Sequence, residues 1–133
     1  MPALGAEGTT KGRTTPMDDL RLAVATHDDV AAITVEGNLD FSTSAALRDA
    51  VDRCADSPAH HVELRFGHIG LMDSSGLGAL VYAHKLLHQR GKDFVLLGDD
   101  AVVKRLLKRT SLDRVFRLRP LGAPDHGPRA ASA

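Results

Sequence analysis

The amino-acid sequence predicts a small α/β fold, with a mixed, mostly parallel sheet of four to five strands and helices packed mainly on one face. Three observations predict this class. Alternating apolar segments are separated by segments with helical spacing, the links between them are short, and the first two alternating segments meet at a turn. Strands that alternate with helices build parallel sheets, whereas a hairpin adds an antiparallel edge.

The chain of 133 residues is long enough for one domain. Residues 1–17 are rich in Gly and Thr and show no periodicity, so we expect a disordered N-terminal tail there. Met17 is an alternative start of the protein. We expect residues 18–119 to form the folded domain and residues 120–133, rich in Pro, Gly and Ala, to form a flexible C-terminal tail.

The domain is predicted to begin with a β-hairpin. Residues 20–24 and 31–36 alternate with period two, and His-Asp-Asp at 27–29 forms the turn between them. Gly37 and Asn38 end the second strand.

A helix is predicted after this hairpin. Its candidate caps are Ser42, Thr43 and Ser44, and Ser57-Pro58 ends it. Four apolar residues at helical spacing form its buried stripe: Leu47, Ala50, Val51 and Cys54.

Residues 61–66 give the clearest strand. Val62, Leu64 and Phe66 point one way, whereas Glu63 and Arg65 point the other. A parallel strand that is buried on both faces is apolar at nearly every position. We therefore expect one side of the sheet to face water at this strand.

The remaining elements follow in the same alternation. A second helix runs to about Arg90 and is ended by Gly91, and residues 94–97 form the fourth strand. Asp99 and Asp100 are candidate caps of a third helix, and residues 115–118 form a short last strand. The third helix is expected to turn three apolar residues inward: Val103, Leu106 and Leu107.

The composition excludes several classes of partner. The 17 basic and 17 acidic residues balance, so no global field favours nucleic acid or an anionic membrane. The basic residues between 104 and 119 are expected to form a solvated face. Cys54 is the single cysteine, which fits a reducing compartment, and no run approaches the ~20 apolar residues of a membrane span. We expect a cytoplasmic protein.

The run Met-Asp-Ser-Ser-Gly-Leu-Gly at 72–78 is the most informative motif. The simplest interpretation is capping, in which Asp73 or a serine accepts a hydrogen bond from the first turn of a helix. The alternative is a hydroxyl displayed at the helix start for modification by another protein. Gly76 and Gly78 favour the alternative, because each costs about 1 kcal/mol in a helix and would let a partner's backbone come close.

A serine-dependent enzyme is the weaker interpretation. The Gly-x-Ser-x-Gly spacing of a nucleophile elbow is absent, and so are the glycine patterns of phosphate and dinucleotide loops. His84 and His88 have metal-ligand spacing without a further ligand in the pattern, so we expect no metal and no cofactor.

Residues 69–80, with DSSGLG at their centre, resemble the signature of the STAS superfamily, specifically the bacterial anti-sigma factor antagonists. Three other segments resemble the family in the right order: residues 35–40, residues 45–51 and residues 102–116. The resemblance covers roughly residues 20–118. Ser111 departs from it, standing where glycine is commoner.

The resemblance implies a role without catalysis. In that family the first serine after the aspartate accepts phosphate from an anti-sigma factor that is a serine kinase, which here implies Ser74, with Ser75 as the second choice. The unphosphorylated antagonist binds the anti-sigma factor and frees a sigma factor, and a phosphatase resets the phosphorylated form. The alternative within the fold is a scaffold or ligand-sensing module whose serine is not a substrate.

Two arguments select the partner-binding residues. The resemblance places Asp40 and Asp73 near the acceptor. A second helical stripe of Leu77, Val81, His84 and His88 either is covered by a neighbouring helix or extends the binding surface, which we favour. The predicted partner-binding residues are Asp40, Asp73, Ser75, Gly76, Leu77, Gly78, Val81 and His84.

Overall fold

The computed structural model describes residues 20–116 and 118–121. The predicted N-terminal tail and most of the predicted C-terminal tail lie outside this range. In the part of the chain that the structure describes, two strands come first, and helices and strands then alternate. The elements are β2 (Leu20–His27), β3 (Val30–Leu39), α1 (Ser44–Asp56), β4 (His61–Met72), α2 (Ser74–Gln89), β5 (Asp93–Leu97), α3 (Ala101–Arg109), the 3-10 turn η1 (Leu112–Arg114) and β6 (Leu118–Arg119).

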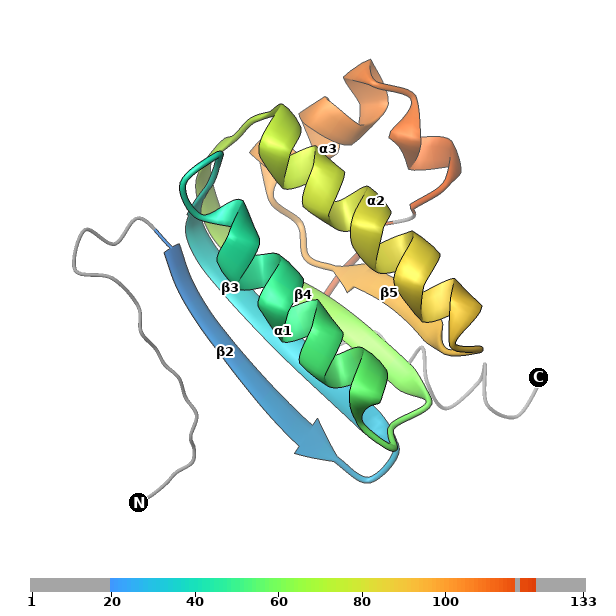
Figure 1. Cartoon of the computed structure of the whole chain (residues 1–133). Helices are drawn as coiled ribbons and strands as arrows, with labels where there is room; N and C mark the ends of the chain where they lie inside the picture. Colours follow the sequence, from blue (N-terminus) through green and yellow to red (C-terminus); the bar gives the residue numbers. More distant parts are fainter. Residues whose placement is uncertain (1–19, 117, 122–133) are drawn as a thin grey trace.

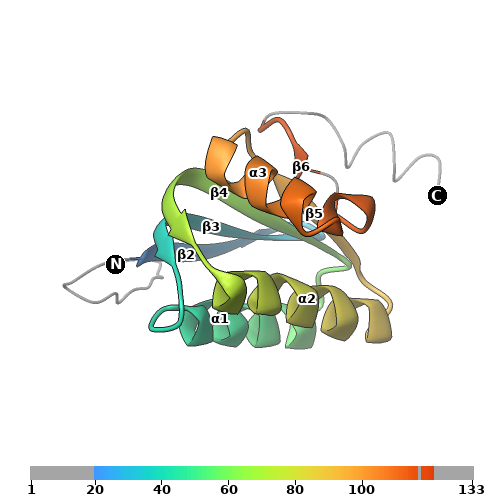
Figure 2. The same ribbon diagram turned by 90° about the horizontal axis from the view of Figure 1, so that it is seen from above.

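The described strands form one five-stranded sheet in the order β2-β3-β4-β5-β6. β2 and β3 pair as an antiparallel hairpin, and the other neighbours are parallel. α1 and α2 lie side by side over one face of the sheet (Figure 1). Figure 2 shows α3 on the other side of the strands. The predicted fold class is therefore confirmed, including the position of most helices on one face.

The alternating residues of the strands build the core under α1 and α2. Register places Ile33 beside Leu64 and Val35 beside Phe66, and Leu96 continues the first row on β5. These side chains are almost fully buried, as is the apolar stripe predicted for α1. Removal of this aliphatic surface from water supplies the main driving force for the fold.

The opposite face of β4 differs from its prediction at one residue. Arg65 is exposed, as expected for a face toward water, but only 3% of Glu63 is exposed. The Arg65 guanidinium lies 2.7 Å from a carboxylate oxygen of Glu63 and compensates the buried charge. Of the two residues predicted to face water, Arg65 does so and Glu63 is buried.

β4 is longer than the sequence predicts. It continues past Phe66 to Met72, although Gly67 and Gly70 weaken the local strand propensity. Pairing with β3 carries it on through two register shifts, so that Leu39 pairs with Met72. The ends of β3 and β4 consequently lie together at one edge of the sheet.

The segment from residue 112 to β6 also differs from its prediction. Residues 112–114 form η1, and the short strand begins at Leu118 and not at Val115. Phe116 is pulled into the core, where its ring meets the Phe94 ring edge-on at 6.3 Å. Ser111 before η1 has φ +63°, a conformation that glycine adopts more easily.

Gly76 fixes how α2 sits on the sheet. A Cβ on this residue would lie 2.5 Å from the backbone oxygen of Leu39 and 3.0 Å from Met72 Cγ. Gly78, one half-turn further, is different, because a Cβ there would lie 3.4 Å from the flexible end of Arg48. Close packing inside the molecule therefore requires the first glycine, whereas access for a partner stays a prediction.

Gly76→Ala is expected to destabilise the fold by at least about 2 kcal/mol, because α2 must move away from the Leu39 carbonyl. Gly78→Ala is the matched control and is expected to be neutral or up to about 1 kcal/mol stabilising, since alanine favours a helix. Urea denaturation followed by circular dichroism measures both. Equal stabilities of the two variants would contradict this packing argument.

Candidate functional site

The candidate site is formed where β3 and β4 end. Because the two strands are parallel and Leu39 pairs with Met72, the residues that follow them, Asp40 and Asp73, start adjacent connections. The backbone N–H of Asp73 donates to the Leu39 carbonyl at 3.3 Å and ties the two connections together. The structure thus brings both predicted aspartates to the edge that carries Ser74.

Asp73 is the N-cap of α2. One carboxylate oxygen accepts from the Ser75 N–H at 2.8 Å and from the Gly76 N–H at 3.3 Å. The cap satisfies two of the N–H groups that a helix start leaves open, and its negative charge complements the helix dipole. The capping interpretation of this motif is therefore correct for Asp73.

Ser74 is the first residue of α2 and is exposed, whereas Ser75 is half-buried. The exposed position leaves the Ser74 side chain accessible to another protein. The difference in exposure favours Ser74 over Ser75 as the residue that a partner would modify.

Asp40 organises the turn before α1. Its carboxylate accepts from the Ser42 hydroxyl at 2.8 Å and from the Ser42 N–H at 3.0 Å, and Thr43 adds a longer hydroxyl contact. These hydrogen bonds, with the Ser42 hydroxyl first, lower the pKa of Asp40 below its ordinary value. A second fixed negative charge therefore stands at this edge of the sheet.

The other predicted partner-binding residues are less accessible. Gly76 and Leu77 are buried, and Val81 packs against the core. His84 is half-buried, and its ring meets the edge of Phe116 at 5.5 Å. The second stripe of α2 is therefore partly covered by the segment after η1, and its role in binding stays a prediction.

Two apolar residues at this edge were not predicted from the sequence. Phe41, next to Asp40, is 84% exposed, and Leu71, before Met72 and Asp73, is 48% exposed. A phenylalanine this exposed is unusual, because phenylalanine is among the residues most often fully buried. The signal in the sequence was an aromatic residue within the otherwise polar turn Asp-Phe-Ser-Thr at 40–43.

Several histidines lie far from Ser74 or have other partners. His60 and His61 stand at the start of β4 beside Asp29, at the opposite end of that strand from Ser74. His68 lies 3.9 Å from Asp100, whose carboxylate also caps α3 as predicted. Among the described residues, no group of three or more potential metal ligands is found.

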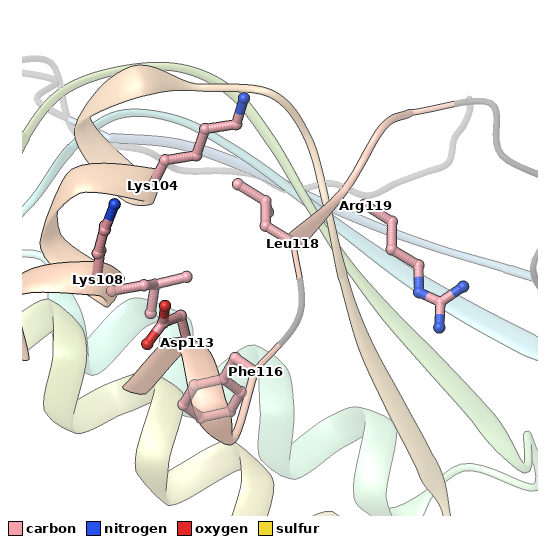
Figure 3. Close-up of a pocket in the computed structure, with 7 residues that line it drawn as sticks. Lys104, Lys108, Asp113, Phe116, Leu118 and Arg119 are labelled. Atoms are coloured by element: carbon pink, nitrogen blue, oxygen red, sulfur yellow. The ribbon is translucent and has the colours of Figure 1, made fainter. Parts of the chain in front are cut away.

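A separate pocket of about 520 Å³ lies between α3, η1 and β6 (Figure 3). Figure 3 shows Lys104 and Lys108 along the helix, Leu118 and Arg119 across from them, and Phe116 below. Leu107 and Asp113 complete the lining. This is the feature of the structure that the ligand-sensing alternative would use.

Comparisons with known proteins agree with this fold. The family model described as the STAS domain matches residues 21–121. An anti-sigma-B factor antagonist of Staphylococcus epidermidis is 32% identical over 94 residues, which cover 71% of this chain and 87% of that protein. In the region of the chain that the structure describes, no helix is both long and apolar enough to cross a membrane.

Solved structures show the same fold. The crystal structure of an anti-sigma factor antagonist from Mycobacterium paratuberculosis has a TM-score of 0.72 and 21% identity, and the match covers 91% of this chain and all of that chain. SpoIIAA of Bacillus, solved in its phosphorylated form, has a TM-score of 0.64 and 16% identity over 83% of this chain and 99% of its own. The chain belongs to the STAS domain family, and its relatives include proteins named anti-sigma factor antagonists.

Proposed function

We propose that this protein is an anti-sigma factor antagonist, which binds an anti-sigma factor with serine kinase activity and loses that partner when Ser74 is phosphorylated. Binding frees a sigma factor, and a protein phosphatase restores the active form. The protein itself is not an enzyme, and the role places it in the cytoplasm. The observation that carries the proposal is the exposed Ser74 at the start of α2, directly after the capping residue Asp73.

The relatives support the role in general terms. Proteins named anti-sigma factor antagonists match most of the described domain, and SpoIIAA, which shares the fold, has been solved in a phosphorylated form. In the proposed reaction the γ-phosphoryl group of ATP passes to Oγ of Ser74, the hydroxyl proton leaves and ADP is released. The kinase supplies all the catalytic groups.

The charges at this edge explain how phosphate would act as a switch. A phosphoserine adds about −1.5 to −2 charges, and here it would join the carboxylates of Asp73 and Asp40. Pressed into a partner's surface, this group would have to lose its water and face like charge. A difference of about 3 kcal/mol between the two forms weakens binding more than a hundredfold.

Phe41 and Leu71 give the same edge an apolar component. Large exposed side chains of this kind serve as the anchors of protein interfaces, whereas charged residues at the rim select the partner. We assign Phe41 as the main anchor, because it is the more exposed of the two and adjoins Asp40.

Phosphorylation is the first test. Incubated with ATP and the anti-sigma kinases of the source genome, the protein is expected to gain one phosphate on Ser74, mapped by mass spectrometry. Ser74→Ala should lose the phosphate, and Ser75→Ala should keep it. The absence of phosphate with every kinase would overturn the proposal, and phosphate on Ser75 would reassign the site. Labelling of Ser74 by a serine-directed covalent probe would instead support an enzyme.

The charge mechanism has its own test in binding affinity. Ser74→Ala is expected to bind the anti-sigma factor about as well as the unmodified protein, whereas Ser74→Glu should bind at least tenfold more weakly, because one added charge reproduces part of the effect of phosphate. Calorimetry or surface plasmon resonance measures both. Equal affinities of the two variants would count against a switch by charge.

The anchor role of Phe41 predicts a separate loss of affinity. Phe41→Ala should weaken binding of the anti-sigma factor about ten- to a hundredfold, the usual range for a buried aromatic anchor. Val115→Ala, at another exposed apolar residue (50% exposed), is the matched control and should leave binding unchanged. The assignment fails if the two variants bind alike.

A further inference from the structure

We propose that the phosphate on Ser74 is held within the protein by Arg48 of α1, which leaves the ring of Tyr82 and passes over Gly78 to reach it. The inference rests on the proposed function, since it concerns the phosphorylated form. It assigns a receptor to the phosphate after the partner has been released.

Two of the N–H groups that can receive a phosphate at a helix start are already occupied here. The N–H groups of Ser75 and Gly76 already donate to the Asp73 carboxylate. Asp40 adds a second negative charge near the same edge, with its pKa held low by the Ser42 hydroxyl. The helix start therefore offers a phosphate little compensation for these charges, and a nearby cation is favoured as its partner.

α1 and α2 place such a cation about one helical turn from Ser74. Both helices follow parallel strands, so they run in the same direction and start at the same edge of the sheet (Figure 1). The Tyr82 hydroxyl donates to Asp52 at 2.5 Å, and Arg48 reaches Gly78. Asp52 and Arg48 of α1 thus lie opposite Tyr82 and Gly78 of α2. Ser74 lies one helical turn, about 5.4 Å, before Gly78.

Arg48 is in position to move along this face. Its guanidinium carbon lies 5.4 Å from the centre of the Tyr82 ring. One of its terminal nitrogens lies 3.4 Å from the point that a Cβ of Gly78 would occupy. Arg48 is exposed, and the glycine places no side chain between its present position and Ser74.

Movement of the Arg48 guanidinium from the Tyr82 ring to the phosphate is expected to be favourable in free energy. A cation over a half-buried aromatic ring is held by about 1–2 kcal/mol, whereas a guanidinium and a phosphate form paired, charge-assisted hydrogen bonds. The other basic residues of α1 and α2, Arg53 and Lys85, lie further along the helices from Ser74. Arg48 is therefore the residue of these helices best placed to receive the phosphate.

The test uses the full chain with phosphoserine incorporated at position 74 during translation, so that no kinase is needed. The second pKa of the phosphate, ordinarily about 6, is measured by phosphorus NMR. We expect it to lie below that of a short phosphopeptide and to rise by about half a unit in Arg48→Gln, because an opposite charge within 4–6 Å favours the dianion. Arg53→Gln, an exposed arginine on the same helix, should leave it unchanged.

Tyr82 provides a second readout, because it is the only tyrosine and the chain has no tryptophan. The hydrogen bond to Asp52 raises the Tyr82 pKa, and Arg48 lowers it. Movement of Arg48 to the phosphate should raise the Tyr82 pKa, which ultraviolet absorbance measures. Phosphoserine at position 74 should therefore raise this pKa more in the protein with Arg48 than in Arg48→Gln.

These measurements test the contact with Arg48 separately from the proposed phosphorylation. The same phosphate pKa in all three proteins, or equal shifts in both arginine variants, would overturn the contact with Arg48. Neither result bears on whether a kinase phosphorylates Ser74, which the kinase assay decides alone.

Discussion

The fold and the candidate site both depend on one contact, the approach of the first turn of α2 to the carbonyl of Leu39. That oxygen accepts the N–H of Asp73 and leaves no room for a side chain on Gly76. The approach is possible because β4 stays paired with β3 up to Met72. It fixes the position of the helix start, and with it the direction in which the Ser74 hydroxyl is presented.

The strands and helices that depend on local pattern could be predicted from the sequence. Alternation in β2 and β3, the short apolar run of β5 and the helical stripes of α1 and α3 predicted their positions within a few residues. The end of β4 and the segment before β6 could not be predicted, because long-range contacts decide them. Pairing with β3 overrides the weak propensity of Gly67 and Gly70, and burial of Phe116 accompanies a strand that begins later than the predicted strand at 115–118.

The site divides in the same way. Capping by Asp73 follows from residue types at a helix start, and was predictable. The residue pattern alone favours access for a partner as the reason for glycine at 76, whereas the structure gives an internal cause in the Leu39 carbonyl. The exposure of Phe41 and the facing of Arg48 to Gly78 depend on how α1 and α2 sit on the sheet, which no local pattern encodes.

The fixed position of the first turn of α2 limits how the proposed phosphorylation of Ser74 can act. The backbone around Ser74 is held by the Asp73 cap and by the Leu39 carbonyl, so a phosphate finds little freedom to rearrange the turn. Its effect must therefore come from charge and bulk at the surface and not from a change of fold. In the proposed phosphorylated form, Arg48 on the neighbouring helix would supply a counter-charge without disturbing the turn at Ser74.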